Sequence, residues 1–211
     1  MKFFKSTWFK CITVLLAILL ISGALIAILS DLLYVSPDMR TMRAVKKIYG
    51  QDMSYAVVFD IDNQEKGDST LTTEEKPLII YDEGRINKIY IIGDKTSGNY
   101  DLLFQSVGYQ GYKGGTITVW TLVKVSSTYD IDKVVLEGYE KQTLMSKLDN
   151  AFYSKFALTD ITDAYQKGEL FTTDSSKNNS NAVSGATYSA NACINAVNCV
   201  IKYVAQGGIS R

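Results

Sequence analysis

The chain contains no histidine among its 211 residues. Histidine is the usual general base near neutral pH and the commonest metal ligand in proteins. Its absence excludes a hydrolase that uses a Ser-His-Asp or Cys-His arrangement, and it argues strongly against a zinc enzyme. We therefore expect no independent acid–base catalytic site and no metal site.

The chain also has no surplus of charge of either sign. It carries 22 basic and 22 acidic residues, so its formal net charge is zero. Nucleic-acid-binding domains normally have a basic surplus that is concentrated on one face. The balance instead predicts a mixed, solvated surface, and we expect no nucleic-acid partner.

Cysteine is scarce, and the three residues present are Cys11, Cys193 and Cys199. Cys11 lies in an apolar N-terminal segment, and the other two lie too far apart around one helix for a disulfide to join them. The spacing shows neither a disulfide framework nor a CxxC motif. We therefore expect Cys193 and Cys199 to pack as small hydrophobic side chains in a core.

One long apolar segment lies near the N-terminus. From Cys11 to Leu29 the sequence reads CITVLLAILLISGALIAIL, without a charge, and at about 1.5 Å per residue a helix of this length nearly spans a hydrocarbon core of about 30 Å. The competing interpretation is a cleaved signal peptide, whose apolar region is shorter, at about 7–15 residues, and ends at a small-x-small site. No convincing site of that kind follows Ile26. The pattern favours a retained transmembrane helix over residues 11–30.

The charges beside this segment predict its orientation. Lys2, Lys5 and Lys10 precede it, whereas Asp31 and Asp38 follow it. A lysine excess on one side of a span places that side in the cytoplasm. We therefore expect residues 1–10 to be cytoplasmic, and residues 31–211 to form one extracytoplasmic domain anchored to the cell membrane.

Periodicity predicts an α+β fold for this domain. Helical spacing appears first between Pro37 and Gly50, with Ser36 as the N-cap and Gly50 as the stop. Period-two segments rich in Val, Ile, Tyr and Thr follow, at residues 55–61, 78–81, 88–92, 102–105, 116–125 and 133–139. Because no helical pattern separates these segments, we expect a mainly antiparallel twisted sheet packed by helices.

Helical spacing returns in the C-terminal part. The apolar residues Leu144, Met145, Leu148, Phe152 and Phe156 predict one helix, and residues 161–166 predict a shorter one. Residues 170–181 are dense in Thr, Ser, Asn and Asp and predict a mobile loop. A final helix is expected from about Ser189 to Gly207-Gly208. Its apolar face would carry Cys193, Ala196, Val197, Val200, Ile201 and Val204. Its polar face would carry Asn191, Asn195, Asn198 and Lys202.

Between that loop and the final helix lies the segment Asn181-Ala182-Val183-Ser184-Gly185-Ala186-Thr187. On the residues alone, Ser184, Thr187 or Ser189 could cap the helix, and Gly185 could supply a turn. The alternative is a phosphate site, because a helix start offers free N–H groups and the positive end of the helix dipole. Gly185 and Ala186 are small enough to let the backbone approach a phosphate closely. The residues alone are compatible with both interpretations.

Ser184-Gly185-Ala186-Thr187, together with Ser189, resembles the flavinylation motif Asp-x-x-(Ser/Thr)-Gly-Ala-Thr of membrane-anchored FMN-binding proteins. That family includes the flavinylated FMN-binding subunits of the Rnf complex and of the Na⁺-pumping NADH:quinone oxidoreductase. The resemblance implies that Thr187 carries FMN through a phosphoester, made by a separate flavin transferase from FAD. It also implies an electron-transfer subunit of an ion-translocating membrane complex, with the other subunits of that complex as partners.

Two further stretches are similar to the family's flavin surroundings. Gly111–Gly115 looks like a Gly-Tyr-x-Gly stretch, and residues 140–147 resemble Glu-Thr-Pro-Gly-Leu-Gly-Ala-Lys. Among the tyrosines, Tyr109, Tyr112 or Tyr188 could stack on the flavin ring. Beside Thr187, the cofactor-binding residues that the resemblance implies are Ser184, Gly185, Ala186, Tyr188, Ser189, Tyr112, Gly114, Glu140, Leu144 and Lys147.

The chain departs from the family pattern in two places. The proline and both glycines of the second stretch are replaced, and Thr143 and Met145 would crowd a flat ring. The leading acid of the motif is Asn181, which keeps the hydrogen-bonding capacity of an acid but not its charge. Two alternatives therefore accompany the complex subunit: a free-standing anchored flavoprotein that passes electrons to extracellular acceptors, and an anchored binding or assembly domain without flavin.

Overall fold

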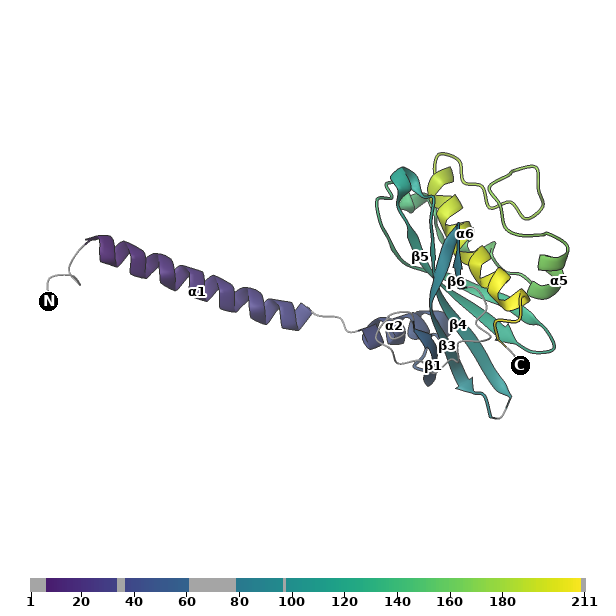
Figure 1. Cartoon of the computed structure of the whole chain (residues 1–211), viewed down its shortest axis with the longest axis horizontal. Helices are drawn as coiled ribbons and strands as arrows, with labels where there is room; N and C mark the ends of the chain where they lie inside the picture. Colours follow the sequence, from purple (N-terminus) through teal and green to yellow (C-terminus); the bar gives the residue numbers. More distant parts are fainter. Residues whose placement is uncertain (1–6, 34–36, 61–78, 97, 210–211) are drawn as a thin grey trace. The chain divides into compact units, whose positions relative to one another are not determined.

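The computed structural model describes residues 7–33, 37–60, 79–96 and 98–209 (Figure 1). The chain forms two compact units, Met1–Arg43 and Ala44–Arg211, and each is described by itself. Ser36, the expected N-cap, lies outside the described residues, as do Ile61 and Leu78 at the ends of two expected strands.

The first unit contains α1 (Thr7–Leu33) and the start of α2 (Pro37–Tyr49). The apolar side chains of α1 that the structure describes are exposed, Ile12, Leu19 and Ile26 among them. Within the described part of the chain, no helix has both the length and the apolar character needed to cross a membrane. Helix α1 does cover the segment 11–30 that was expected to be helical. Its insertion into a membrane stays a prediction.

A six-stranded sheet forms the centre of the second unit, in the order β1-β3-β4-β5-β6 with β2 paired to β3. The strands are β1 (Tyr55–Asp60), β2 (Ile80–Tyr81), β3 (Gly84–Asp94), β4 (Asn99–Gly108), β5 (Ile117–Val125) and β6 (Tyr129–Tyr139). Every pair of these strands is antiparallel. The predicted α+β class and antiparallel sheet are confirmed. Several strands extend beyond the predicted segments because ladder pairing, rather than the apolar pattern, sets their ends.

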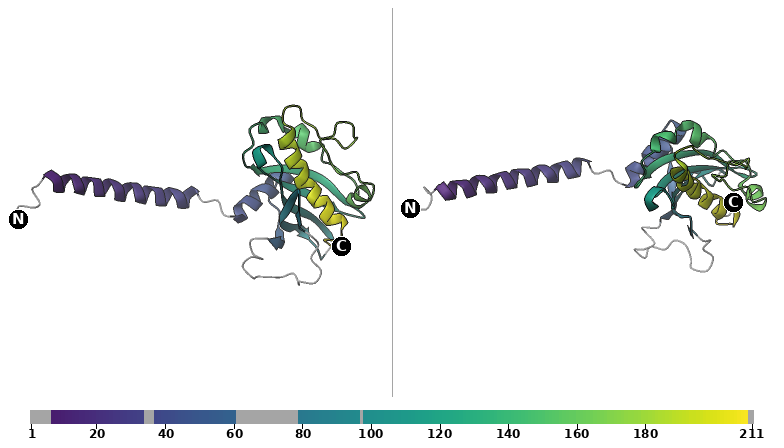
Figure 2. Two further views of the ribbon diagram at one scale, coloured as in Figure 1. Left: turned by 45° about the horizontal axis from the view of Figure 1, so that its top comes forward. Right: turned by 90° about the horizontal axis from the view of Figure 1, so that it is seen from above.

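Both faces of the sheet are covered. Val119 and Val123 pack into the main core with helix α6 (Thr187–Ala205), which lies across that face (Figures 1 and 2). Trp120 and Leu122 point to the opposite face and pack with Val45 near the C-terminal end of α2. That helix ends as predicted, because Gly50 has a φ of +74° and its N–H bonds to the Lys46 carbonyl oxygen at 2.8 Å.

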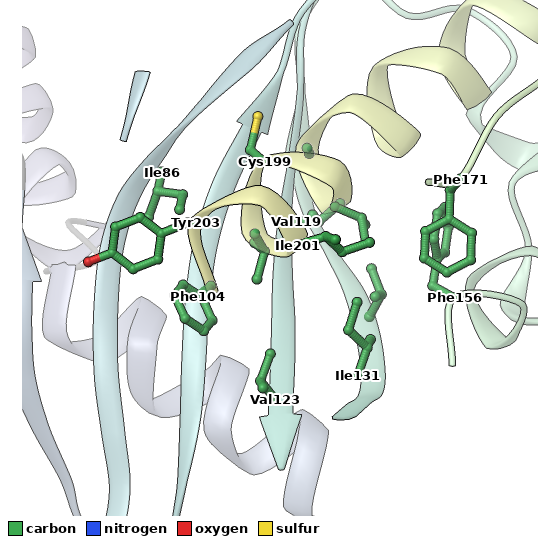
Figure 3. Close-up of a cluster of buried hydrophobic side chains, with 14 of the residues drawn as sticks. Ile86, Phe104, Val119, Val123, Ile131, Phe156, Phe171, Cys199, Ile201 and Tyr203 are labelled. Carbon is green, nitrogen blue, oxygen red and sulfur yellow. The ribbon is translucent and has the colours of Figure 1, made fainter. Parts of the chain in front are cut away.

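The main core combines α6 with short C-terminal segments (Figure 3). Ile201 and Tyr203 of α6 face the strands, and Phe156 lies 5.0 Å from Phe171, centroid to centroid, in an edge-to-face pair. Helix α6 comes very close to the sheet at Gly108 of β4. A Cβ atom there would lie 1.8 Å from the carbonyl oxygen of Ala192, so only glycine allows this separation.

The single helix predicted over residues 144–156 was wrong. A 3₁₀ turn, η3 (Met145–Lys147), is followed by the separate short helix α4 (Asn150–Ser154). The break lies at Asp149, whose side chain accepts a hydrogen bond from the Phe152 N–H and so caps a new helix start. The shorter helix predicted at residues 161–166 is confirmed as α5 (Ile161–Gln166).

The polar face predicted for the final helix was partly wrong, because Asn195 and Asn198 are buried. Asn198 brackets the backbone of Phe171: its Oδ1 accepts from the N–H at 3.1 Å, and its Nδ2 donates to the carbonyl oxygen at 2.9 Å. Asn195 Nδ2 donates to the Tyr109 carbonyl oxygen at 3.1 Å. Both amides are buried because the backbones of Tyr109 and Phe171 pack against α6 and form hydrogen bonds with these side chains.

The two helical cysteines are buried thiols, as predicted. Burial raises the pKa of Cys199 to about 12 and raises the pKa of Cys193 as well. The thiolate is the form that attacks reagents such as maleimides, so neither residue should react near neutral pH. In a Cys11→Ser variant, we expect a maleimide to label no thiol in the native protein and both thiols after unfolding. Labelling of the native variant at either position would contradict the burial of α6.

Candidate functional site

A cleft of about 210 Å³ opens at the N-terminal end of α6. Three segments that are far apart in the sequence form its walls: the 3₁₀ turn η2 (Tyr112–Gly114) before β5, the loop after β6, and the segment that enters α6. The residues that line it are Tyr112, Thr143, Leu144, Gly185, Ala186, Thr187, Tyr188 and Ser189. The structure therefore brings together members of all three stretches that the sequence singled out.

Thr187 is the first residue of α6, and its side chain is exposed. The N-cap residue is Ala186, and it makes no side-chain capping hydrogen bond. Ser189, one of the candidate caps, instead donates from Oγ to Gln142 Oε1 at 2.8 Å. The helix start therefore keeps its N–H donors and the positive end of its dipole at the cleft, where an anion is favoured.

Gly185 and Lys147 form the cationic side of this helix entry. Gly185 has a φ of +76°, and a Cβ atom there would lie 2.6 Å from Lys147 Nζ. The same ammonium donates to the carbonyl oxygen of Ser184 at 3.1 Å. The backbone conformation therefore favours glycine, and a side chain there would also push the Lys147 ammonium away from its present place. The positive charge of Lys147 lies beside the segment that carries the exposed residues Ser184 and Thr187. This charge further favours a bound anion.

An aromatic and apolar surface surrounds the rest of the cleft. Tyr112, Leu144 and Tyr188 are 36%, 41% and 66% exposed, which is high for large hydrophobic side chains. Solvated apolar groups gathered at a cleft are typical of a ligand site. The arrangement suits a ligand with a phosphate at one end and a flat ring at the other.

Gln142, which sequence reasoning did not select, lies behind the cleft and is only 8% exposed. Its Oε1 accepts from the Tyr112 N–H at 3.1 Å in addition to the Ser189 hydroxyl, and its Nε2 donates to the Glu140 carbonyl oxygen at 3.0 Å. The family pattern has proline at this position, so the resemblance gave no signal for it. The signal that was present is the pair of glycines, Gly111 and Gly115, that pack against this amide.

Other predicted residues lie outside the lining of the cleft. Gly114 has a φ of +69° with open space around it, and the Glu140 side chain is exposed. Tyr109 uses its carbonyl oxygen to hold Asn195. Of the two residues expected to crowd a ring, Thr143 does line the cleft, whereas Met145 packs against the main core.

Asn181 is also away from the cleft. It is 2% exposed, its N–H donates to the Thr172 carbonyl oxygen at 2.8 Å, and its side-chain Nδ2 has no hydrogen-bond partner among the described residues. It borders a separate cavity of about 910 Å³ together with residues 176–180. In this conformation the Asn181 amide is therefore not presented on the surface that carries Thr187.

Comparisons with models of protein families, with curated proteins and with solved structures gave no match. Among the residues that the structure describes, no cluster of histidine, cysteine or carboxylate side chains could hold a metal ion. The site is therefore interpreted from its own geometry and from the motif that it contains.

Proposed function

We propose that the protein is a flavoprotein electron carrier with FMN attached through a phosphoester to Thr187. The observation that carries this proposal is the exposed Thr187 side chain at the start of α6, which has no side-chain cap, in one cleft with Tyr112, Leu144 and Tyr188. A bound flavin supplies the redox chemistry, and the protein has to tether and orient it. This role needs no histidine.

Attachment would require a flavin transferase with FAD as the donor. The Thr187 oxygen forms the new bond to the flavin-bearing phosphorus, AMP leaves, and the hydroxyl proton passes to solvent. The resulting phosphodiester carries one negative charge. The N–H groups at the start of α6 and the ammonium of Lys147, 3.1 Å from the Ser184 carbonyl oxygen, would hold that charge.

Tyr112, Leu144 and Tyr188 would hold the ring by stacking and apolar contact. The volume of the cleft, about 210 Å³, is below the roughly 300–1,000 Å³ of sites that enclose a ligand. Thr143 occupies part of it, where the family motif has glycine. We therefore expect the ring to lie at the mouth of the cleft, partly open to solvent, which leaves an edge accessible to an electron-transfer partner.

We further propose that residues 11–30 anchor the protein in the cytoplasmic membrane and that residues 31–211 lie outside it. The support is the uncharged run from Cys11 to Leu29 and the lysines that precede it. The partners would be the other subunits of an Rnf-type complex or of an NADH:quinone oxidoreductase. Copurification with several multi-span subunits is expected for this assignment, whereas purification alone would favour a free-standing carrier.

The test of the flavin is a denaturing gel viewed under ultraviolet light. The protein is co-expressed with the flavin transferase of its own source, and we expect a fluorescent band at the mass of the chain, 23.4 kDa, plus the flavin. A dark band from well-folded protein would contradict the proposal. It would favour the flavin-free binding domain, for which Thr143 in the cleft and the buried Asn181 are the supporting features.

A further inference from the structure

We propose that Gln142 is the positioning residue that fixes the three walls of the cleft relative to one another. It would thereby set the pose of the flavin ring. The claim about the cleft walls stands on the geometry alone, and the claim about the ring rests on the function proposed above.

The side-chain amide of Gln142 reaches each wall. Its Oε1 accepts from the Tyr112 N–H at 3.1 Å in the turn before β5 and from the Ser189 hydroxyl at 2.8 Å in the first turn of α6. Its Nε2 donates to the Glu140 carbonyl oxygen at 3.0 Å on its own wall. Tyr112 and Ser189 both line the cleft. One amide therefore fixes the positions of two cleft residues that come from different segments.

The turn before β5 is shaped to receive this amide. A Cβ atom on Gly111 would lie 2.4 Å from Gln142 Nε2, and one on Gly115 would lie 2.6 Å from the same nitrogen. Neither distance is tolerable between real atoms, so with a side chain at either position the amide could not keep its present place. The same Cβ atoms would meet backbone oxygens, that of Gly115 at 2.6 Å from position 111 and that of Glu140 at 2.1 Å from position 115, so the amide and the backbone together require these two glycines.

Three residues near the Gln142 amide have strained backbone conformations. Gln110, Lys113 and Lys141 are non-glycine residues with φ of 65°, 52° and 54°, in the left-handed region. Such residues cost free energy and persist only where the surrounding structure holds them. All three lie on the two loops that Gln142 joins.

The first experiment measures amide hydrogen exchange in the flavin-free protein. Gln142→Met keeps the side-chain length but removes every hydrogen bond of the amide, and it should raise exchange at the Tyr112 amide about tenfold, the loss of one buried hydrogen bond. Gln142→Glu keeps the acceptor oxygens and should preserve protection at Tyr112. The amide of Leu103 in β4, a core strand, serves as the internal control and should not change.

A second route avoids any change to Gln142 itself. Gly111 has an ordinary φ of −72°, so Gly111→Ala strains no backbone angle, and its Cβ would meet Gln142 Nε2 at 2.4 Å and the Gly115 carbonyl oxygen at 2.6 Å. It should raise Tyr112 exchange as Gln142→Met does, and it replaces that variant if the latter fails to fold. Unchanged Tyr112 protection in whichever of these variants folds would overturn the proposal.

The second experiment uses the flavin-loaded protein and compares the visible absorption spectrum and reduction potential of wild type, Gln142→Met and Gln142→Glu. We expect both properties to shift in the methionine variant and to lie nearer the wild type in the glutamate variant. Identical spectra and potentials in all three, with Tyr112 exchange raised, would overturn the claim about the ring. Absence of flavin from the wild type would refute the proposed function, and the exchange experiment would still decide the role of Gln142 in the cleft.

Discussion

Replacing Gly108 by alanine should destabilise the second unit by more than about 3 kcal/mol, at or above the upper end of ordinary overpacking. The added Cβ would lie 1.8 Å from the Ala192 carbonyl oxygen and 2.6 Å from the Ala196 backbone nitrogen. Both atoms belong to the backbone of α6, so no side-chain rotation relieves the clash. The helix would have to lift off β4, and the core beneath it would open. Native proteins are stable by only about 5–15 kcal/mol, so this loss is a large fraction of the total.

The measurement is the free energy of unfolding from guanidinium denaturation, and the matched control is Gly138→Ala in β6. A Cβ on Gly138 meets no atom within 4 Å, and its φ is not positive, so that substitution should change stability by about 0.5 kcal/mol or less. Ala192→Gly should not rescue Gly108→Ala, because the clash is with a backbone oxygen. Equal stabilities of the Gly108 and Gly138 variants would contradict the close contact between α6 and β4.

Replacing Thr187 by alanine should abolish covalent flavin and leave the fold intact. The side chain is exposed and does not cap α6, so its removal should change the unfolding free energy by about 0.5 kcal/mol or less. The loss of flavin should be complete because the bond to phosphorus is made by the Thr187 oxygen. Thr187→Ser keeps a hydroxyl at the same helix start and should retain attachment.

Two neighbouring hydroxyls provide matched controls for this series. Thr143 lines the same cleft and Ser184 lies in the same motif, but neither is the proposed acceptor. Fluorescence on a denaturing gel should therefore persist in Thr143→Ala and in Ser184→Ala. Equal fluorescence in Thr187→Ala and wild type would move the attachment elsewhere, and a Thr187→Ala protein with a lowered melting temperature would show that the residue is structural.

Much of the fold could be predicted from local patterns. The period-two pattern of residues 116–125 predicted a strand, and β5 has Val119 and Val123 on one face and Trp120 and Leu122 on the other. Such predictions succeed because side-chain direction in a strand depends only on position along it. The end of α2 at Gly50 was also predictable from a local signal, because a glycine in the left-handed conformation ends a helix without help from distant residues.

Features that depend on contacts between distant segments could not be predicted in this way. The need for glycine at position 108 comes from a helix that begins at Thr187. Asn195 and Asn198 look like solvent-facing residues until the Tyr109 and Phe171 backbones pack against them. The apolar spacing over residues 144–156 suited one long helix, but Asp149 caps a new helix start and α4 begins there.

Several residues that line the cleft could be predicted from the sequence, but the hydrogen bonds that join its walls could not. The motif resemblance selected Thr187, Tyr112 and Leu144, and the cleft contains all of them. It did not select Gln142, whose hydrogen bonds join residues 30 and 47 positions away in the sequence. A polar residue acquires such a role only when the fold brings those positions together, so no local pattern marks it.

The most direct test of the central claim is the mass of the tryptic peptide that contains Thr187. Trypsin should cut after Lys177 and Lys202, which releases residues 178–202 as one peptide that carries Ser180, Ser184, Thr187 and Ser189. In protein co-expressed with its transferase, we expect this peptide to be heavier by one FMN less water. Fragmentation should place the added mass on Thr187. An unmodified peptide, or an adduct on one of the serines, would contradict the account.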